Sequence, residues 1–183
     1  TAKRLHKEIP LNKKTDIKPT MLMLIFTIAG FLGFIYEEIC VYINDGVFAK
    51  RGTTFGPWIP IYGFGALLIF FLTIWFRKKP WLVFIVSSLS CGLLELATGY
   101  VLDKFFNMRL WNYSIVRWNW GNLNGYICIR SVVTWGVFAL LLIYAILPLL
   151  EKFKKKLPRV FTIVSIALFS LFALDIVLSL TLK

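Results

Sequence analysis

The chain has 183 residues, of which 58% are hydrophobic and only 16% are charged. Soluble domains average about 45–50% apolar and about 25% charged residues, so the composition argues against a water-soluble globular protein. The charge is also unbalanced, with 21 Lys and Arg against 9 Asp and Glu. Together these features predict a multi-pass protein of the cell membrane, whose basic segments lie outside the bilayer.

Composition excludes several kinds of site as well. The single histidine, His6, lies in the polar N-terminal segment, which excludes His-based triads, multi-His metal sites and haem. Cys40, Cys91 and Cys128 lack CxxC spacing and lie in or beside apolar stretches, so buried thiols are expected rather than disulfides. No cofactor, metal ion or nucleic acid is expected as a partner, and no GxxxxGK[ST] motif for ATP occurs.

Five apolar runs are long enough to cross about 30 Å of hydrocarbon at about 1.5 Å per residue. They lie near 21–43, 59–76, 81–102, 127–149 and 160–182. The chain is therefore expected to be an all-α transmembrane bundle of about five spans. No linker divides it, so a basic tail over 1–20 and a single transmembrane domain over 21–183 are predicted. The second run is the shortest, and the glycine and prolines at its start are also compatible with a broken or re-entrant entry.

The distribution of basic residues predicts the orientation. Segments 1–20, 77–80 and 150–159 contain 14 Lys and Arg, whereas the remaining loops and the C-terminus contain 6. Because loops rich in Lys and Arg stay on the cytoplasmic side, the N-terminus is expected to be cytoplasmic. With five spans, the C-terminus and the two longer loops would then lie outside.

Three glutamates, Glu37, Glu38 and Glu95, occur within these spans, where an ionisable side chain costs roughly 2.5–3.5 kcal/mol. Glu38 points away from the helical face of Glu37 and could lie at the level of the headgroups. Glu37 shares a helical face with two glycines of the first run, and Glu95 lies in a small-residue stripe of the third. Arg51 and Arg130 could supply the opposite charge. Glu37, Glu95 and the two arginines are expected to converge in one outward-facing cluster, either a site that carries protons or coordinates a cationic group, or a structural ion-pair network. Asp175, alone in the last run, is expected to serve packing or oligomer contact.

The loop before the fourth run is rich in aromatic and amide side chains. Trp111 and Tyr113 suit an aromatic belt at the membrane interface. Asn122 or Asn124 could cap the following helix, or they could face a ligand.

Several segments in this order resemble a known family, the bacterial membrane proteins named "putative ABC-transporter permease, type IV". The matching segments are FLGFIYE (31–37), RG followed by FGPWIPIYGFGA (51–66), LLE (93–95), WNYS (111–114) and NLNGYIC followed by WG (122–136). The resemblance implies the following family-motif positions: Glu37, Arg51, Gly56, Pro57, Pro60, Tyr62, Gly63, Glu95, Trp111, Tyr113, Asn122, Asn124 and Gly125. The sequence departs from the expected pattern after NLNG, where Tyr126 replaces an arginine and Arg130 follows one turn later.

Three functions remain open at this stage. The first is a transport component whose polar pocket binds a small solute or a lipid-like substrate. The second is a membrane-embedded enzyme acting on a lipid or cell-envelope substrate, with Glu37 and Glu95 as general base and acid. The third is a non-catalytic scaffold or accessory subunit. The candidate substrate-binding residues are Glu37, Arg51, Tyr62, Glu95, Trp111, Tyr113, Asn122, Asn124 and Arg130.

The expected partners are the lipid bilayer and a second copy of the chain. The family name also implies a separate ATPase subunit. The basic links, of about four and about ten residues, leave little room for a helix that couples to an ATPase.

Overall fold

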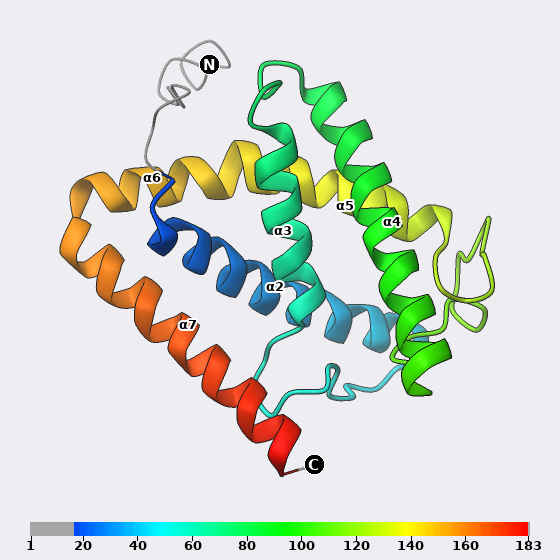
Figure 1. The fold of residues 1–183 in the computed structure, drawn as a ribbon. Coiled ribbons are helices and arrows are strands. Elements are labelled where there is room, and N and C mark those ends of the chain that lie inside the picture. Colours follow the sequence, from blue (N-terminus) through cyan, green and yellow to red (C-terminus); the bar gives the residue numbers. More distant parts are fainter. Residues whose placement is uncertain (1–16, 183) are drawn as a thin grey trace.

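The computed structural model describes residues 17–182, and within that range the chain is helical without a β-strand (Figure 1). The elements are α2 (Pro19–Asp45), α3 (Pro60–Thr73), α4 (Pro80–Phe106), α5 (Ile129–Leu141), the π-helical turn η1 (Leu142–Ile146), α6 (Leu147–Lys156) and α7 (Pro158–Thr181). The predicted all-α class is confirmed. Most of the predicted basic tail, residues 1–16 with His6, lies outside the described residues.

Proline marks the start of four helices. Pro19, Pro60, Pro80 and Pro158 are the first residues of α2, α3, α4 and α7. The first helical residue needs no intrahelical hydrogen bond from its N–H, and the proline ring already fixes φ near the helical value. The apolar runs therefore begin as helices at sharply defined residues.

Four helical segments have the length and composition to cross a membrane: α2, α4, the continuous run Ile129–Lys156 and α7. The second predicted run forms α3, which has 14 residues and a length of about 21 Å at 1.5 Å per residue. It is the shortest, as predicted, and it alone does not reach across about 30 Å of hydrocarbon. Irregular backbone from Gly46 to Ile59 precedes it.

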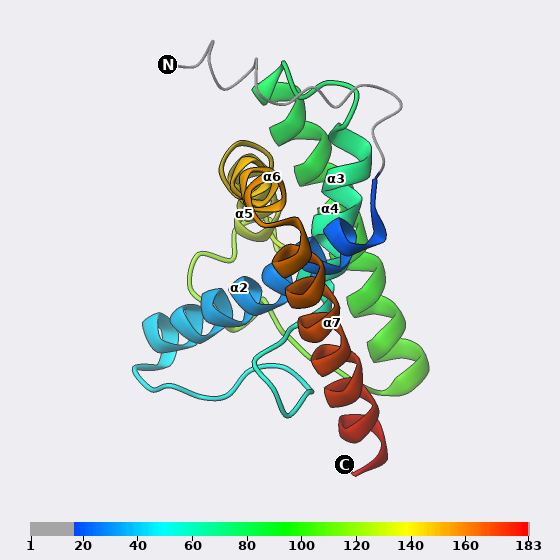
Figure 2. The ribbon, with the colours of Figure 1, turned by 90° about the vertical axis from the view of Figure 1, so that its left-hand side faces the viewer.

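The helices pack largely against their neighbours in sequence. α2 packs against α3 and α7, and α4 packs against α3 and α5 (Figures 1 and 2). The glycine pattern explains the close approach of α2 to the start of α3. The Ile59 N–H donates to the Gly30 carbonyl, and a Cβ atom at Gly33 would overlap the Tyr62 ring.

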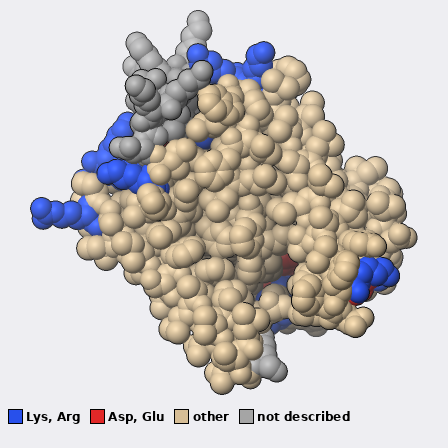
Figure 3. All heavy atoms as spheres, viewed as in Figure 1, with Lys and Arg blue, Asp and Glu red and all other residues tan. Residues whose placement is uncertain are grey.

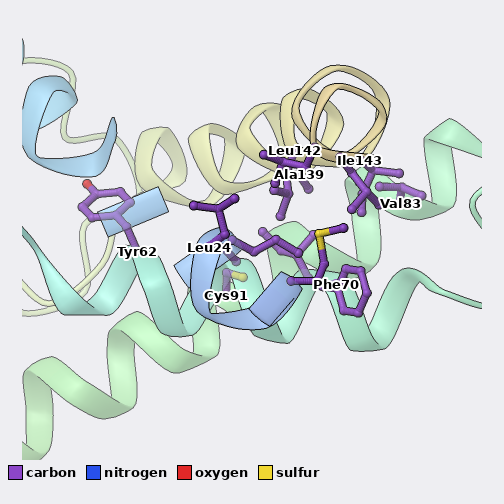
Figure 4. Packing of buried hydrophobic residues seen from close by; sticks show 14 of the residues in the cluster. Leu24, Tyr62, Phe70, Val83, Cys91, Ala139, Leu142 and Ile143 are labelled. Atoms are coloured by element: carbon purple, nitrogen blue, oxygen red, sulfur yellow. The ribbon is translucent and has the colours of Figure 1, made fainter. Parts of the chain in front are cut away.

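One apolar core joins the helices. Leu24 of α2, Phe70 of α3 and Val83 of α4 meet Ala139 and Ile143 of the α5–η1 segment (Figure 4). Tyr62 lies at the far side of this cluster, toward the other end of α3. The core therefore holds α3 rigidly between α2 and α4 and fixes where the Tyr62 ring lies.

The π-helical turn has a local cause in the sequence. Pro148 follows η1 and has no N–H to donate to the carbonyl of Tyr144, and its ring would collide with that carbonyl in a regular α-helix. Widening the preceding turn avoids the collision. The Tyr144 hydroxyl donates to the Arg77 carbonyl at 2.5 Å, which ties this turn to the link between α3 and α4.

The surface is mostly apolar, as a lipid-facing surface requires. Lysine and arginine side chains gather along the upper left edge in Figure 3, and a broad surface without charged side chains separates them from a small group at the lower right. Only 17% of the most apolar window of α7 is buried within the protein. These features, together with the four long apolar helices, make this a multi-pass membrane protein. Cys91 and Cys128 are buried free thiols as predicted, while Cys40 is half-buried.

Candidate functional site

Glu37 lies on α2 and meets two partners from the segment that follows. The Tyr62 hydroxyl donates a hydrogen bond to Glu37 Oε1 at 2.7 Å. Arg51 Nε lies 3.6 Å from Glu37 Oε2, and these side chains are 34% and 22% exposed. The ion pair predicted from sequence charge is therefore present between Glu37 and Arg51.

Glu95 lies on α4 and is much more enclosed, with 6% of its surface exposed. Tyr113 donates its hydroxyl proton to Glu95 Oε1 at 2.5 Å, and Trp135 Nε1 donates to Oε2 at 3.1 Å. Each carboxylate oxygen of Glu95 thus accepts a hydrogen bond from a neutral side chain, one in a loop and one in α5. Burial, followed by the nearby Glu95 carboxylate, raises the pKa of Tyr113 well above its usual value, so Tyr113 remains a proton donor near neutral pH.

The two glutamates line the same cavity, which has a volume of about 430 Å³. Six of the residues predicted to bind substrate lie on its wall: Glu37, Arg51, Tyr62, Glu95, Trp111 and Tyr113. Lys50 and Trp135 also line it and were not among the predicted site residues. Trp135 belongs to the WG dipeptide of the family resemblance. Its contact with Glu95, 40 residues away in the chain, depends on the tertiary structure.

The other three predicted binding residues do not line this cavity. Arg130 lies over the face of the Tyr113 ring, with its Cζ 5.9 Å from the ring centroid. The predicted convergence of both arginines with both glutamates is therefore only partly observed: Arg51 enters the cavity wall, and Arg130 contacts a wall residue.

Asn122 and Asn124 shape the loop before α5. Asn122 Oδ1 accepts from the Gly125 N–H at 2.8 Å, and the Asn124 carbonyl accepts from Arg109 Nη2 at 2.6 Å. The prediction that one of these asparagines caps the helix is wrong. Cys128 and Ser131 form the cap through reciprocal bonds at the first turn of α5. The loop also returns to Tyr113, whose N–H donates to the Gly125 carbonyl at 2.9 Å.

The loop before α3 is held from two sides. Glu38 Oε1 accepts from the Arg51 N–H at 2.7 Å, which positions the backbone of the cavity-lining arginine. On the other side, both oxygens of Asp175 lie 3.0 Å from the Gly56 N, and Ser179 Oγ accepts from the Phe55 N–H at 3.0 Å. Asp175 therefore has a packing role, as expected from sequence, and the structure adds the identity of its partner.

The chemistry available at the cavity follows from these contacts. It offers two carboxylates, one paired arginine, one lysine and several aromatic faces, which suits binding of a cationic or hydrogen-bonding group. Across residues 17–182 no cluster of three or more His, Cys, Asp or Glu side chains could hold a metal ion.

Comparison with known protein families gave a match to a family model. The model described as "Putative ABC-transporter type IV" matches residues 24–180. Comparisons with curated proteins and with solved structures gave no match. The match spans all seven helical elements except the first five residues of α2 and the last residue of α7. The chain is thus a multi-pass, transporter-like membrane protein, and it belongs to the family of putative ABC-transporter type IV proteins.

Proposed function

We propose that the protein is a transport component that binds a small solute or a lipid-like substrate in the cavity lined by Glu37 and Glu95. The substrate carries an ammonium group, and Glu95 is its main anchor. The observation that supports this proposal most is the placement of Glu95, which is almost fully enclosed at the wall of a 430 Å³ cavity.

The charges around the cavity leave Glu95 without a cation. Arg51 is paired with Glu37, and Lys50 Nζ donates to the Phe55 carbonyl at 2.6 Å. Within residues 17–182, Glu95 has no Lys, Arg or His nitrogen within salt-bridge distance. A buried carboxylate without a counter-ion is costly, so a cationic ligand would gain more at Glu95 than at the paired Glu37.

The aromatic lining supports the same ligand class. Tyr62, Trp111, Tyr113 and Trp135 all line the cavity. An ammonium group over the face of a tyrosine or tryptophan gains about 0.5–2 kcal/mol, more when the group is desolvated. Carboxylates and aromatic faces together therefore favour an ammonium group over a neutral group of the same shape.

Binding of choline tests this proposal. Choline is compared with the uncharged dimethylbutanol isostere, in which carbon replaces the ammonium nitrogen. The protein is held in maltoside micelles, because phosphatidylcholine would itself supply the ammonium group. We expect choline, and not the isostere, to bind the unmodified protein and raise its thermal unfolding temperature.

Two variants locate the binding. Glu95→Gln should weaken choline binding at least about tenfold, equivalent to 1.4 kcal/mol. The control is Asp45→Asn, which removes an exposed carboxylate at the end of the same bundle and should bind choline normally. Equal binding of choline and its isostere, or unchanged binding by Glu95→Gln, would contradict the proposal.

A membrane-embedded enzyme is the second candidate, because both carboxylates and Arg51 line one cavity. In that function Glu37 and Glu95 serve as general base and acid on a lipid or cell-envelope substrate. Incubation of the reconstituted protein with labelled envelope lipids separates the two candidates: a product that Glu37→Gln and Glu95→Gln both abolish supports the enzyme. If the double glutamine variant is abundant, folded and fully active in cells, the cavity is structural and the protein is a scaffold or accessory subunit.

Orientation and assembly belong to the same proposal. Loop charge supports a cytoplasmic N-terminus, with the cavity toward the outer side. Labelling of a cysteine introduced at exposed Trp120 or Lys79 by a membrane-impermeant maleimide tests this: only the Trp120 position should react in intact cells.

A second copy of the chain and an ATPase subunit are the proposed protein partners, and purification under mild conditions followed by mass measurement tests for both.

A further inference from the structure

A second, apolar space lies beside the cavity. It is a groove of about 240 Å³ between α2 and the α5–η1 segment, with α3 at its base. Its lining is almost wholly hydrocarbon and aromatic, and it includes Ala29, Ile39, Ala66 and Phe138. The groove therefore offers contact surface for an apolar ligand and few partners for a polar one.

The groove and the cavity share a wall. Tyr62 and Trp135 line both spaces, and their ring centroids are 5.1 Å apart. The polar atoms of both side chains point to the cavity, where the Tyr62 hydroxyl reaches Glu37 and the Trp135 N–H reaches Glu95. Their rings thus separate a polar compartment from an apolar one.

The two compartments also adjoin along α2. Glu37 lines the cavity, whereas its neighbour Tyr36 and the preceding Gly33 line the groove. A molecule with a polar end and an apolar end could therefore contact both spaces at once from the same stretch of helix.

The surroundings of the groove identify its occupant. Leu32, Ile39 and Leu141 line it and remain 39%, 49% and 48% exposed, on helices that have the composition of membrane spans. Beside a bilayer, such an opening meets hydrocarbon rather than water.

We infer that the groove takes the hydrocarbon chain of a single amphiphile whose ammonium head group lies in the Glu37–Glu95 cavity. The inference rests on the proposed function and names its substrate class: a cationic or zwitterionic lipid rather than a small solute. Because bilayer hydrocarbon is as apolar as the groove, the chain adds orientation and shape selection, while the head group supplies the affinity.

Photolabelling tests the position of the chain. The probe is an alkyltrimethylammonium amphiphile with a diazirine in its chain, bound to the protein in maltoside micelles. We expect the label to concentrate on groove residues of α2 and α5. Labelling spread evenly over the exposed face of α7 would overturn the inference.

Matched substitutions sharpen the test. Ala29→Phe fills the groove and should reduce labelling there about tenfold, because close-packed side chains leave no room for the chain. Ala167→Phe makes the same change on an exposed position of α7 and should label normally. If Ala29→Phe does not fold, Ile35→Trp at the groove rim replaces it, with Ile166→Trp on α7 as its control. Unchanged labelling in a folded groove variant would overturn the inference.

Choline, which has the head group without the chain, separates the two proposals. Choline should bind the Ala29→Phe protein as well as it binds the unmodified protein. If choline binds but the groove is not labelled, the cavity proposal stands and the chain site is refuted. If the groove is labelled but choline does not bind, and labelling survives Glu95→Gln, the ammonium cavity is refuted and the chain site stands.

Discussion

The hydrogen bond from Trp135 to Glu95 provides a direct test of how the cavity wall is held. Trp135→Phe keeps an aromatic ring next to Tyr62 but removes the N–H that reaches Glu95 Oε2 at 3.1 Å. Oε1 keeps its donor, Tyr113, and Oε2 loses the indole N–H. Glu95 as a whole is only 6% exposed, so the lost hydrogen bond lies in a buried environment.

The expected magnitude lies between two reference values. A hydrogen bond to a charged group in a soluble protein contributes about 1.5–3 kcal/mol. Hydrogen bonds between transmembrane helices average about 0.6 kcal/mol and reach about 1.7 kcal/mol, because the unfolded helices also find partners in the membrane. The strong burial of Glu95 places its bond near the upper end of the membrane range, so we expect a coupling of about 1–1.5 kcal/mol.

A double-mutant cycle isolates this coupling from the smaller volume of phenylalanine. The variants are Trp135→Phe, Glu95→Met and the pair, and the measurement is the free energy of reversible unfolding in mixed detergent micelles. Trp111→Phe makes the same chemical change, but Trp111 donates to the Tyr126 carbonyl at 2.9 Å, so it should not couple to Glu95→Met. A Trp135–Glu95 coupling below about 0.3 kcal/mol, the usual limit of additivity, would refute the reasoning.

Three further predictions concern the loop before α3, the contact of α2 with α3 and the link between α3 and α4. Asp175→Ala leaves the Gly56 N–H without its acceptor, which should cost about 1–2 kcal/mol and speed proteolysis of the loop before α3; unchanged cleavage would contradict this. Gly33→Ala should lower the free energy of unfolding by about 1–3 kcal/mol, because its Cβ would overlap the Tyr62 ring, and an unaltered unfolding curve would refute that overlap. Burial lowers the pKa of Arg77 to about 10, so folding disfavours the charged guanidinium. The free energy of unfolding should therefore rise with pH only above that value, where the folded protein releases the proton before the unfolded chain does. Arg77→Met should therefore be neutral or slightly stabilising, by up to about 1 kcal/mol, at neutral pH; a loss above about 2 kcal/mol in thermal unfolding would show that the nearby Glu151 carboxylate and the Phe70 ring outweigh the cost of burial.

The sequence predicted the helices well because their causes are local. An apolar run of sufficient length must form a helix in a membrane, where each backbone N–H and C=O needs an internal partner. Proline at the first position then sets the start, as at Pro80 and Pro158. A small residue in an apolar run permits a close helix approach, as at Gly33, where the absence of a Cβ makes room for the Tyr62 ring.

The candidate site was partly predictable for a similar reason. Carboxylates within apolar runs are costly unless they face the protein interior, so the sequence predicts that Glu37 and Glu95 point inward. Both residues line one cavity. Which arginine pairs with each glutamate depends on the conformation of the loops. Arg51 meets Glu37, whereas Arg130 lies against Tyr113 instead, and periodicity within one helix carries no information on that choice.

The sequence alone determined the class of protein, the approximate extent of its helices and two acidic positions that line the cavity, because hydropathy, proline and charge act over a few residues. Only the tertiary structure decided what those positions contact. Asp175 reaches Gly56 across 119 residues of chain, Trp135 supplies the second donor to Glu95, and Tyr62 and Trp135 separate the polar cavity from the apolar groove. Each of these contacts depends on the relative placement of helices that are far apart in sequence, and long-range packing sets that placement.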